Sequence, residues 1–138
     1  MILQEKLQED WHSLDIKLLF FVFVGGGLGS IARYLCAIFL QKFSYFPLGT
    51  LFVNVFGAFL MGACIYLFFE KNLSSDWKIF LMSGFLGGFT TFSSFGMEVF
   101  FMMKQGYFYK TLLYVCASNF LVFLCVYLGF VFAKKLVN

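Results

Sequence analysis

The spacing of the charged residues constrains the fold of this chain more than any other feature. Long apolar stretches of 22 to 25 residues separate the charged clusters: 18–41, 48–69, 79–103 and 111–133. A helix needs about 20 apolar residues to cross about 30 Å of hydrocarbon. We therefore predict an all-α membrane protein in which residues 17–138 form one domain of four transmembrane helices, joined by loops too short to hold a soluble domain.

Composition agrees with that prediction. Of the 138 residues 62% are hydrophobic and only 12% are charged, whereas soluble domains carry about a quarter charged residues. The net charge of +3 is spread over the loop ends, so we expect contact with membrane lipid and none with nucleic acid. The four cysteines fall inside the spans without metal-ligand spacing and predict apolar packing rather than a disulfide. The predicted location is the inner (cytoplasmic) membrane, crossed several times.

Residues 1–16 do not have the pattern of a signal peptide, because their charge is acidic and the apolar stretch that follows is too long. Leu3, Leu7 and Trp11 recur every four residues. This N-terminal segment is therefore either a short helix lying at the membrane interface or a frayed terminus.

The two sides of the membrane differ only weakly in their number of cations. Four spans place the N-terminus, the loop between the second and third spans and the C-terminus on one side. That side carries six lysines, and the other carries three lysines, or four cations if Arg33 reaches it. The positive-inside rule favours the N-terminus inside. A bias this weak is typical of a protein that inserts in both orientations, although proteins with one orientation also show it.

Small residues recur at the spacing that lets membrane helices approach closely. The pairs are Gly25 and Gly29, Ala58 and Gly62, and Gly84 and Gly88. Four short helices enclose little space by themselves, so a pathway for a solute would require an oligomer, most often a two-fold dimer.

Polar groups deep in a bilayer are costly, so each one needs a reason. Asn54 lies seven residues into the second span, one turn after Thr50. Its amide either clamps two helices together or donates into a pathway. Arg33 either extends to the interface or holds a fixed cation at the mouth of an anion route. Glu98 is expected to be structural, bonded to a neighbouring helix.

The fourth span places two hydroxyls in register. Tyr114 and Ser118 are four residues apart and share one helix face. They can form a short polar track, while Asn119 on the adjacent face is expected to make an interhelical bond.

The third span is the most unusual, because Gly87-Gly88 is followed closely by Thr90-Thr91. This pattern predicts a break near the middle of the helix. A break frees backbone carbonyls, which at membrane depth must be buried or must face water or an ion, and such oxygens suit a small cation such as Na⁺. Beyond the break, Phe92 and Phe95 project on one side, and the positive edges of their rings can face an anion. With 23 phenylalanines in the chain, lipid-facing or core packing is the alternative.

Four segments together resemble the signature segments of the Fluc (CrcB-like) fluoride channels. They are "GGGLGSIARY" at 25–34, "GTLFVNVFGAFLMG" at 49–62, "GFLGGFTTFSSFGME" at 84–98 and "YVCASNFLVFLCVYLG" at 114–129. The similarity extends over about 18–133, and the order and spacing of the segments make it specific.

The resemblance implies an antiparallel, dual-topology homodimer with two fluoride pores and a structural Na⁺ at its centre. The Na⁺ ligands would be the carbonyls of Gly87 and Thr90 from each subunit. By motif position, Arg33 would lie near a vestibule, and the pore side chains would be Thr50, Asn54, Phe92, Phe95, Tyr114 and Ser118.

This chain departs from the family at Val122, where members can carry another small hydroxyl. The polar track is then shorter here, or Ser94 compensates from the third helix and also belongs to the pore.

The predicted function is that of a passive, fluoride-selective channel that exports F⁻ from the cytoplasm, and not that of an enzyme, since no nucleophile–base pair stands out. One alternative is a small four-helix, proton-coupled exporter of cations or drugs, which needs an embedded carboxylate. The other is a non-transporting scaffold subunit, which would leave the break and the paired rings unexplained.

Overall fold

The computed structural model describes residues 15–41 and 46–137. The predicted N-terminal segment, apart from its last two residues, lies outside this part of the chain. The described residues contain four helices long and apolar enough to cross a membrane. The predicted all-α class and the number of spans are therefore confirmed.

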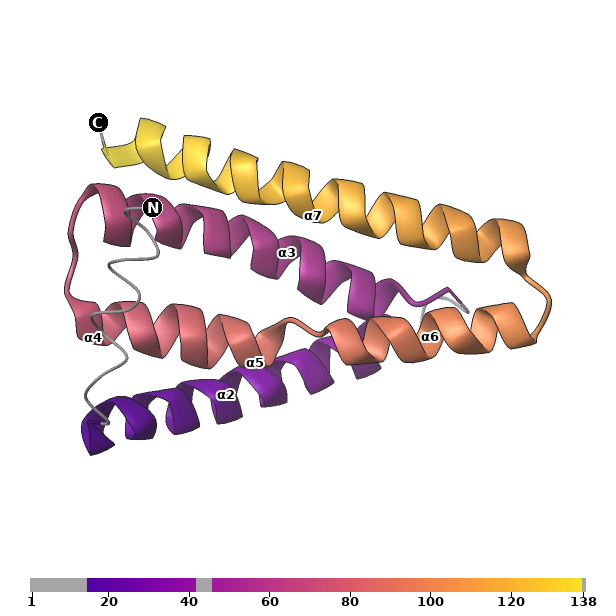
Figure 1. Ribbon diagram of the computed structural model, residues 1–138, viewed down its shortest axis with the longest axis horizontal. Helices are drawn as coiled ribbons and strands as arrows, with labels where there is room; N and C mark the ends of the chain where they lie inside the picture. The colour runs from indigo at the N-terminus through magenta and orange to yellow at the C-terminus, as the bar shows by residue number, and fades with distance from the viewer. Residues whose placement is uncertain (1–14, 42–45, 138) are drawn as a thin grey trace.

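The first span is α2 (Ile16–Gln41), and the second is α3 (Leu48–Ile65), which continues into one π-helical turn, η1 (Tyr66–Glu70). Several short elements make up the first half of the third span: α4 (Ser75–Lys78), the π-helical η2 (Ile79–Leu86) and α5 (Gly87–Phe89). The second half is α6 (Phe92–Lys104), and α7 (Phe108–Val137) is the fourth span (Figure 1).

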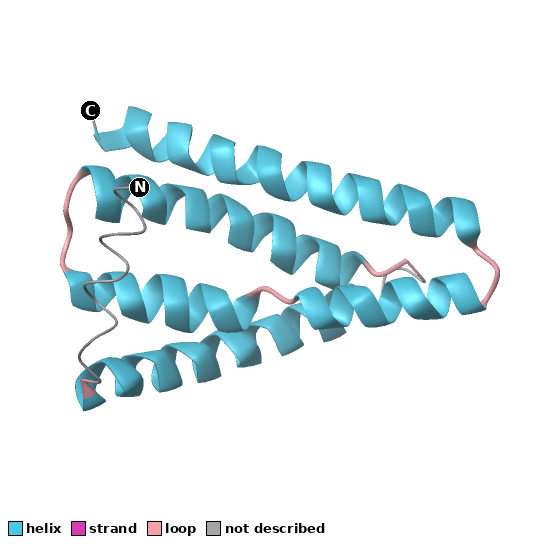
Figure 2. Cartoon of the chain, in the orientation of Figure 1, coloured by secondary structure: helices cyan, strands magenta, loops and turns pink. Residues whose placement is uncertain are grey.

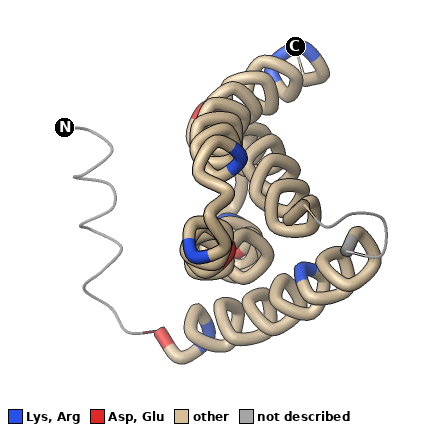
Figure 3. The backbone as a smooth tube through the Cα atoms, turned by 90° about the vertical axis from the view of Figure 1, so that its right-hand side faces the viewer, with Lys and Arg blue, Asp and Glu red and all other residues tan. Residues whose placement is uncertain are grey.

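The helices are arranged so that α3 and the third span lie between α2 and α7 (Figure 1). The C-terminus, the start of α2 and the turn before α4 lie at one end, while the turn between α6 and α7 lies at the other. Figure 2 shows loop structure only at the helix ends and at one point within the third span. Viewed along the helices, the chain is almost entirely tan, with little blue or red (Figure 3).

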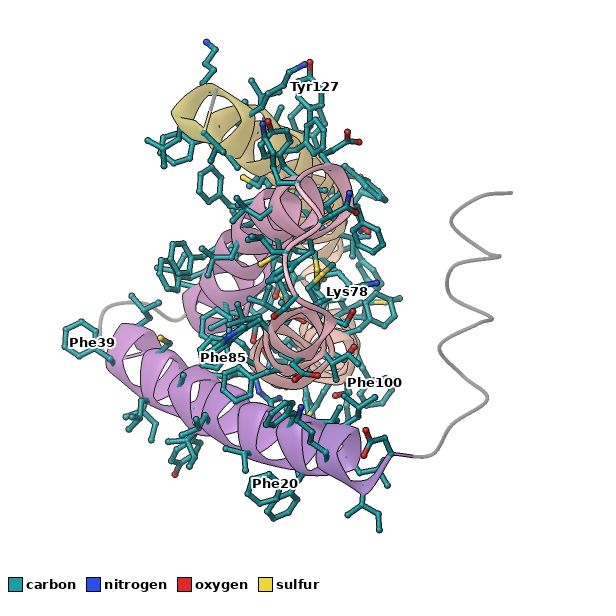
Figure 4. The ribbon with its side chains drawn as sticks, turned by 90° about the vertical axis from the view of Figure 1, so that its left-hand side faces the viewer. Phe20, Phe39, Lys78, Phe85, Phe100 and Tyr127 are labelled. Carbon is teal, nitrogen blue, oxygen red and sulfur yellow. The ribbon has the colours of Figure 1, made fainter. Side chains whose placement is uncertain are left out.

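Large apolar side chains cover the outside of the bundle, as expected for a surface that faces hydrocarbon. Phe20 and Tyr127 point away from the other helices (Figure 4). In water such a surface would drive aggregation, but in a bilayer it is compatible with the surrounding lipid.

The glycines of the first and third spans bring two backbones into contact. A Cβ on Gly25 would lie 2.6 Å from the carbonyl oxygen of Phe80, and one on Gly84 would lie 3.1 Å from the Cα of Gly25. The small-residue pairs of these two spans therefore face each other within one chain. This contact holds the first half of the third span against α2.

A second glycine contact joins α3 to α7. A Cβ on Gly62 would collide with the carbonyl group of Val126, and one on Gly129 would collide with the carbonyl group of Phe59. The pairing is reciprocal, since each glycine faces the backbone of the other helix. It fixes how α7 lies along α3, and this in turn sets which α7 side chains reach the site described below.

We expect Gly129→Ala to destabilise the protein by about 1–3 kcal/mol, because the added methyl group forces α7 away from α3. Gly27→Ala is the matched control, since a Cβ at Gly27 meets nothing within 4 Å and alanine favours helix by up to about 1 kcal/mol. Thermal unfolding in detergent measures both variants. Equal midpoints for the two would contradict the close contact.

Candidate functional site

The third span changes conformation at two adjacent threonines. Helix α5 ends at Phe89, and Thr90 (φ −81°, ψ 156°) and Thr91 (φ −151°, ψ 120°) are extended before α6 begins at Phe92. The Thr91 side chain caps the new helix, since its Oγ1 accepts a hydrogen bond of 3.2 Å from the Ser94 N–H. We name residues 90–91 the third-span linker.

The linker is held by a side chain from the second span. Asn54 Nδ2 donates to the Thr91 carbonyl oxygen at 2.9 Å, and the Thr91 N–H donates to Asn54 Oδ1 at 2.7 Å. The amide thus imitates the pairing that a β-strand would offer to extended backbone. This is the clamp that the sequence left open as one role for Asn54. Because the NH₂ group has two hydrogens, one donor is left for a ligand.

These bonds remove the normal helix donors from two carbonyl groups. In an uninterrupted α-helix, the Thr91 N–H would bond the Gly87 carbonyl and the Ser94 N–H would bond the Thr90 carbonyl. Here the first is directed to Asn54 and the second to the Thr91 hydroxyl. The backbone oxygens of Gly87 and Thr90 are therefore available as hard ligands, the kind that suits Na⁺.

A groove of 310 Å³ opens beside the linker between α3, α6 and α7. Four of the predicted pore residues line it: Asn54, Phe92, Phe95 and Ser118. We name this cavity the central groove. It also contains Asn119 and Val122.

Ser118 places an unsatisfied hydroxyl in the wall of the central groove. The residue is only 6% exposed, and its Oγ has no hydrogen-bond partner within the described residues. A buried hydroxyl without a partner costs about 1–3 kcal/mol. A ligand or water in the groove would remove this cost, and the hydroxyl hydrogen makes Ser118 a suitable donor for an anion.

The two phenylalanines of the third span have different environments. Phe92 is 80% exposed, whereas Phe95 is 8% exposed and packs against Tyr114 with ring centroids 5.1 Å apart. Their own rings are 5.6 Å apart and tilted by 36°. Both rings line the central groove, with Phe95 fixed by packing and Phe92 at its open side.

Thr50 and Tyr114, both predicted for the pore, each donate a hydrogen bond to the same carboxylate. Thr50 Oγ1 donates to Glu98 Oε1 at 2.5 Å, and the Tyr114 hydroxyl donates to Glu98 Oε2 at 2.7 Å. Glu98 therefore connects α6 to both α3 and α7, as the structural interpretation of this residue expected. Neither hydroxyl lines the central groove, and we name the three residues the Glu98 junction.

Arg33 and Ser94 lie in a second, smaller cavity. This space of 190 Å³ is also lined by Thr50 and Thr91, so it is next to the linker on the side away from α7. The Nε of Arg33 is buried and has no hydrogen-bond partner within the described residues. Ser94 accepts a hydrogen bond from Thr91 Oγ1 at 3.0 Å. Ser94 lines this second cavity, whereas Val122 lines the central groove.

Sequence reasoning gave Thr91 no role of its own, yet this residue caps α6, pairs with Asn54 and lines both cavities. The Thr-Thr pair predicted a break but not which threonine would hold it. The sequence pattern also did not indicate that Asn119 lines the central groove.

The sequence of the chain is similar to proteins of one family. A family model described as CrcB-like protein, Camphor Resistance (CrcB), matches residues 20–130. A fluoride-specific ion channel FluC from Hydrogenobaculum is 44% identical over 110 residues, covering 78% of this chain and 90% of the relative. One from Pyrococcus abyssi is 38% identical over 123 residues, covering 88% of this chain and 100% of the relative. A third, from Shewanella denitrificans, is 43% identical over 113 residues, covering 80% and 91%.

We expect Asn54→Leu to loosen the linker, because the backbone N–H and carbonyl of Thr91 both lose their partners in the Asn54 side chain. A loss of about 2 kcal/mol of local stability corresponds to amide hydrogen exchange about 30-fold faster over the linker. The amide of Thr111, bonded to Tyr107 at the start of α7, is the internal control. Unchanged exchange at the linker would contradict the clamp.

Proposed function

This chain belongs to the CrcB-like protein family, and we propose that it is a fluoride-specific ion channel, the activity for which its relatives are named. It is a multi-pass integral membrane protein of a channel family and not an enzyme. The observation that supports the proposal best is the central groove, which is lined together by Asn54, Ser118, Phe92 and Phe95, with the Ser118 hydroxyl buried and without a hydrogen-bond partner within the described residues.

The groove matches the chemistry of a small, strongly hydrated anion. Fluoride can leave water only if other donors replace its hydration shell, and it can move on only if no donor holds it tightly. Asn54 and Ser118 offer neutral donors, and the ring edges of Phe92 and Phe95 offer a weak positive field. Arg33, the fixed cation nearby, lies in the second cavity and not in the groove, so it can attract an anion towards the site without binding it inside.

The alternative of a proton-coupled exporter requires a carboxylate that binds substrate and proton in turn. Glu98 is the acid of α6, and one of its oxygens accepts a hydrogen bond from Thr50 while the other accepts one from Tyr114. It does not line the central groove. Its place in the Glu98 junction favours a passive channel over coupled export.

The working unit that we propose is an antiparallel, dual-topology homodimer with two pores. The weak asymmetry of cations between the two ends suits insertion in both orientations. The exposed ring of Phe92 and the open side of the groove suit completion by a second copy. In this proposal the dimer lets F⁻ leave the cytoplasm across the inner membrane.

A structural Na⁺ at the dimer centre also fits the residues present. The helix donors of the Gly87 and Thr90 carbonyls are directed elsewhere, and the two oxygens lie at either end of one short segment. Two such segments from two subunits would offer four hard oxygen ligands. The ion would compensate carbonyl groups that lack helix partners at membrane depth.

Fluoride efflux from liposomes that contain the purified protein tests the function, with a fluoride electrode as the readout. We expect rapid release of F⁻ without release of Cl⁻. Phe92→Ile should lower the rate by up to about tenfold, because the positive ring edge is lost. A folded protein that releases no F⁻, or releases Cl⁻ equally fast, would refute a fluoride channel. Parent-like flux in Phe92→Ile would refute only the role of the ring.

Replacement of Na⁺ tests the proposed cation separately from the flux. In a buffer whose only cation is the large organic ion N-methylglucamine, we expect a lower thermal midpoint for the purified protein. A Na⁺ concentration a hundredfold above its Kd stabilises by about 2.7 kcal/mol, and removal loses that amount. An equal midpoint in both buffers at matched ionic strength argues against a structural Na⁺.

A further inference from the structure

Asn119 is a polar residue of the central groove to which the proposed pore gives no role. It follows Ser118 on α7 and lines the groove with it. The next groove-lining residues along α7 are Val122 and Val126, both apolar. Asn119 is therefore the last polar side chain that α7 contributes to the groove, and beyond it the α7 wall of the groove is apolar.

The amide of Asn119 is oriented by its own helix. Its Nδ2 donates to the carbonyl oxygen of Val115, one turn earlier, at 2.7 Å. A carbonyl oxygen can only accept, so this contact fixes which end of the amide is the NH₂ group. One N–H is used in the bond and the second is left to donate. The interhelical bond expected from the sequence is not formed within the described residues.

At the depth of Asn119 in the membrane, an amide without hydrogen-bond partners costs free energy. The residue lies about 5 Å from the midpoint of α7 at a rise of 1.5 Å per residue. Lipid tails at that depth offer neither donors nor acceptors. The side chain is exposed in the described chain, so its remaining polar atoms must meet water, an ion or another protein chain.

We propose that Asn119 is an additional anion-contacting residue of the conduction path, and that its free N–H donates to fluoride at the end of the polar track. This proposal rests on the channel function proposed above. The groove then holds three neutral donors, from Asn54, Ser118 and Asn119. Asn119 would take over the role of the hydroxyl that family members can carry at the position of Val122. A donor at this point lets the anion pass from one hydrogen-bond partner to the next before it reaches the apolar wall.

Asn119→Leu and Asn119→Asp test the role, with Phe120→Leu as the matched control. Leucine keeps the shape of asparagine and removes the donor, whereas aspartate adds a negative charge that repels an anion. Phe120 is the neighbouring residue, is exposed and does not line the groove. We expect F⁻ efflux per folded protein to fall about tenfold for Asn119→Leu and further for Asn119→Asp. The control should conduct like the parent.

Each variant is also measured by gel filtration and thermal unfolding in detergent, so that flux is compared only between assembled proteins. Parent-like flux in Asn119→Leu overturns the proposal. So does a loss of assembly with unchanged flux per remaining dimer, which would show that the amide bonds a second subunit. Equal losses for Asn119→Leu and Phe120→Leu overturn it as well, since both would then act through packing. A parent that conducts no F⁻ refutes the channel function itself, whereas the results for the Asn119 and Phe120 variants do not bear on it.

Discussion

The two hydrogen bonds between the Asn54 amide and the Thr91 backbone are the interaction on which the rest of the site depends. Extended backbone inside a membrane span leaves polar groups that lipid cannot satisfy. The amide satisfies two of them at once, and so makes the third-span linker tolerable at this depth. The same bonds take the Thr91 N–H from the Gly87 carbonyl, and α6 begins anew at Phe92, with Phe95 packed against Tyr114.

The other polar residues of the spans divide into fixed and available groups. At the Glu98 junction two hydroxyls satisfy both carboxylate oxygens, which ties α3, α6 and α7 together and leaves no carboxylate in the central groove. Ser118 and Asn119 retain hydrogen-bonding capacity there. A groove whose lining residues offer neutral donors and include no carboxylate suits an anion better than a cation.

Much of the architecture could be predicted because it follows from local pattern. Apolar length predicted the four spans, and glycine spacing predicted close helix contacts. Which helices would meet could not be read from the same pattern, because any two small-residue faces are compatible. The structure pairs Gly25 with the third span and Gly62 with α7. Thr50 and Tyr114 show the same limit. A hydroxyl within a span predicts a hydrogen bond but does not identify the acceptor, which here is Glu98.

The sequence by itself determined a four-span membrane protein and the family to which its motifs belong, because hydrocarbon thickness and backbone sterics act on consecutive residues. Only the tertiary structure decided how the polar side chains are used. Asn54 both clamps the linker and keeps one donor, Ser94 lines the same cavity as Arg33, and Asn119 lines the central groove. The physical reason is that a hydrogen bond is satisfied by whichever partner the packing of separate helices brings within about 3 Å, and this partner is remote in sequence.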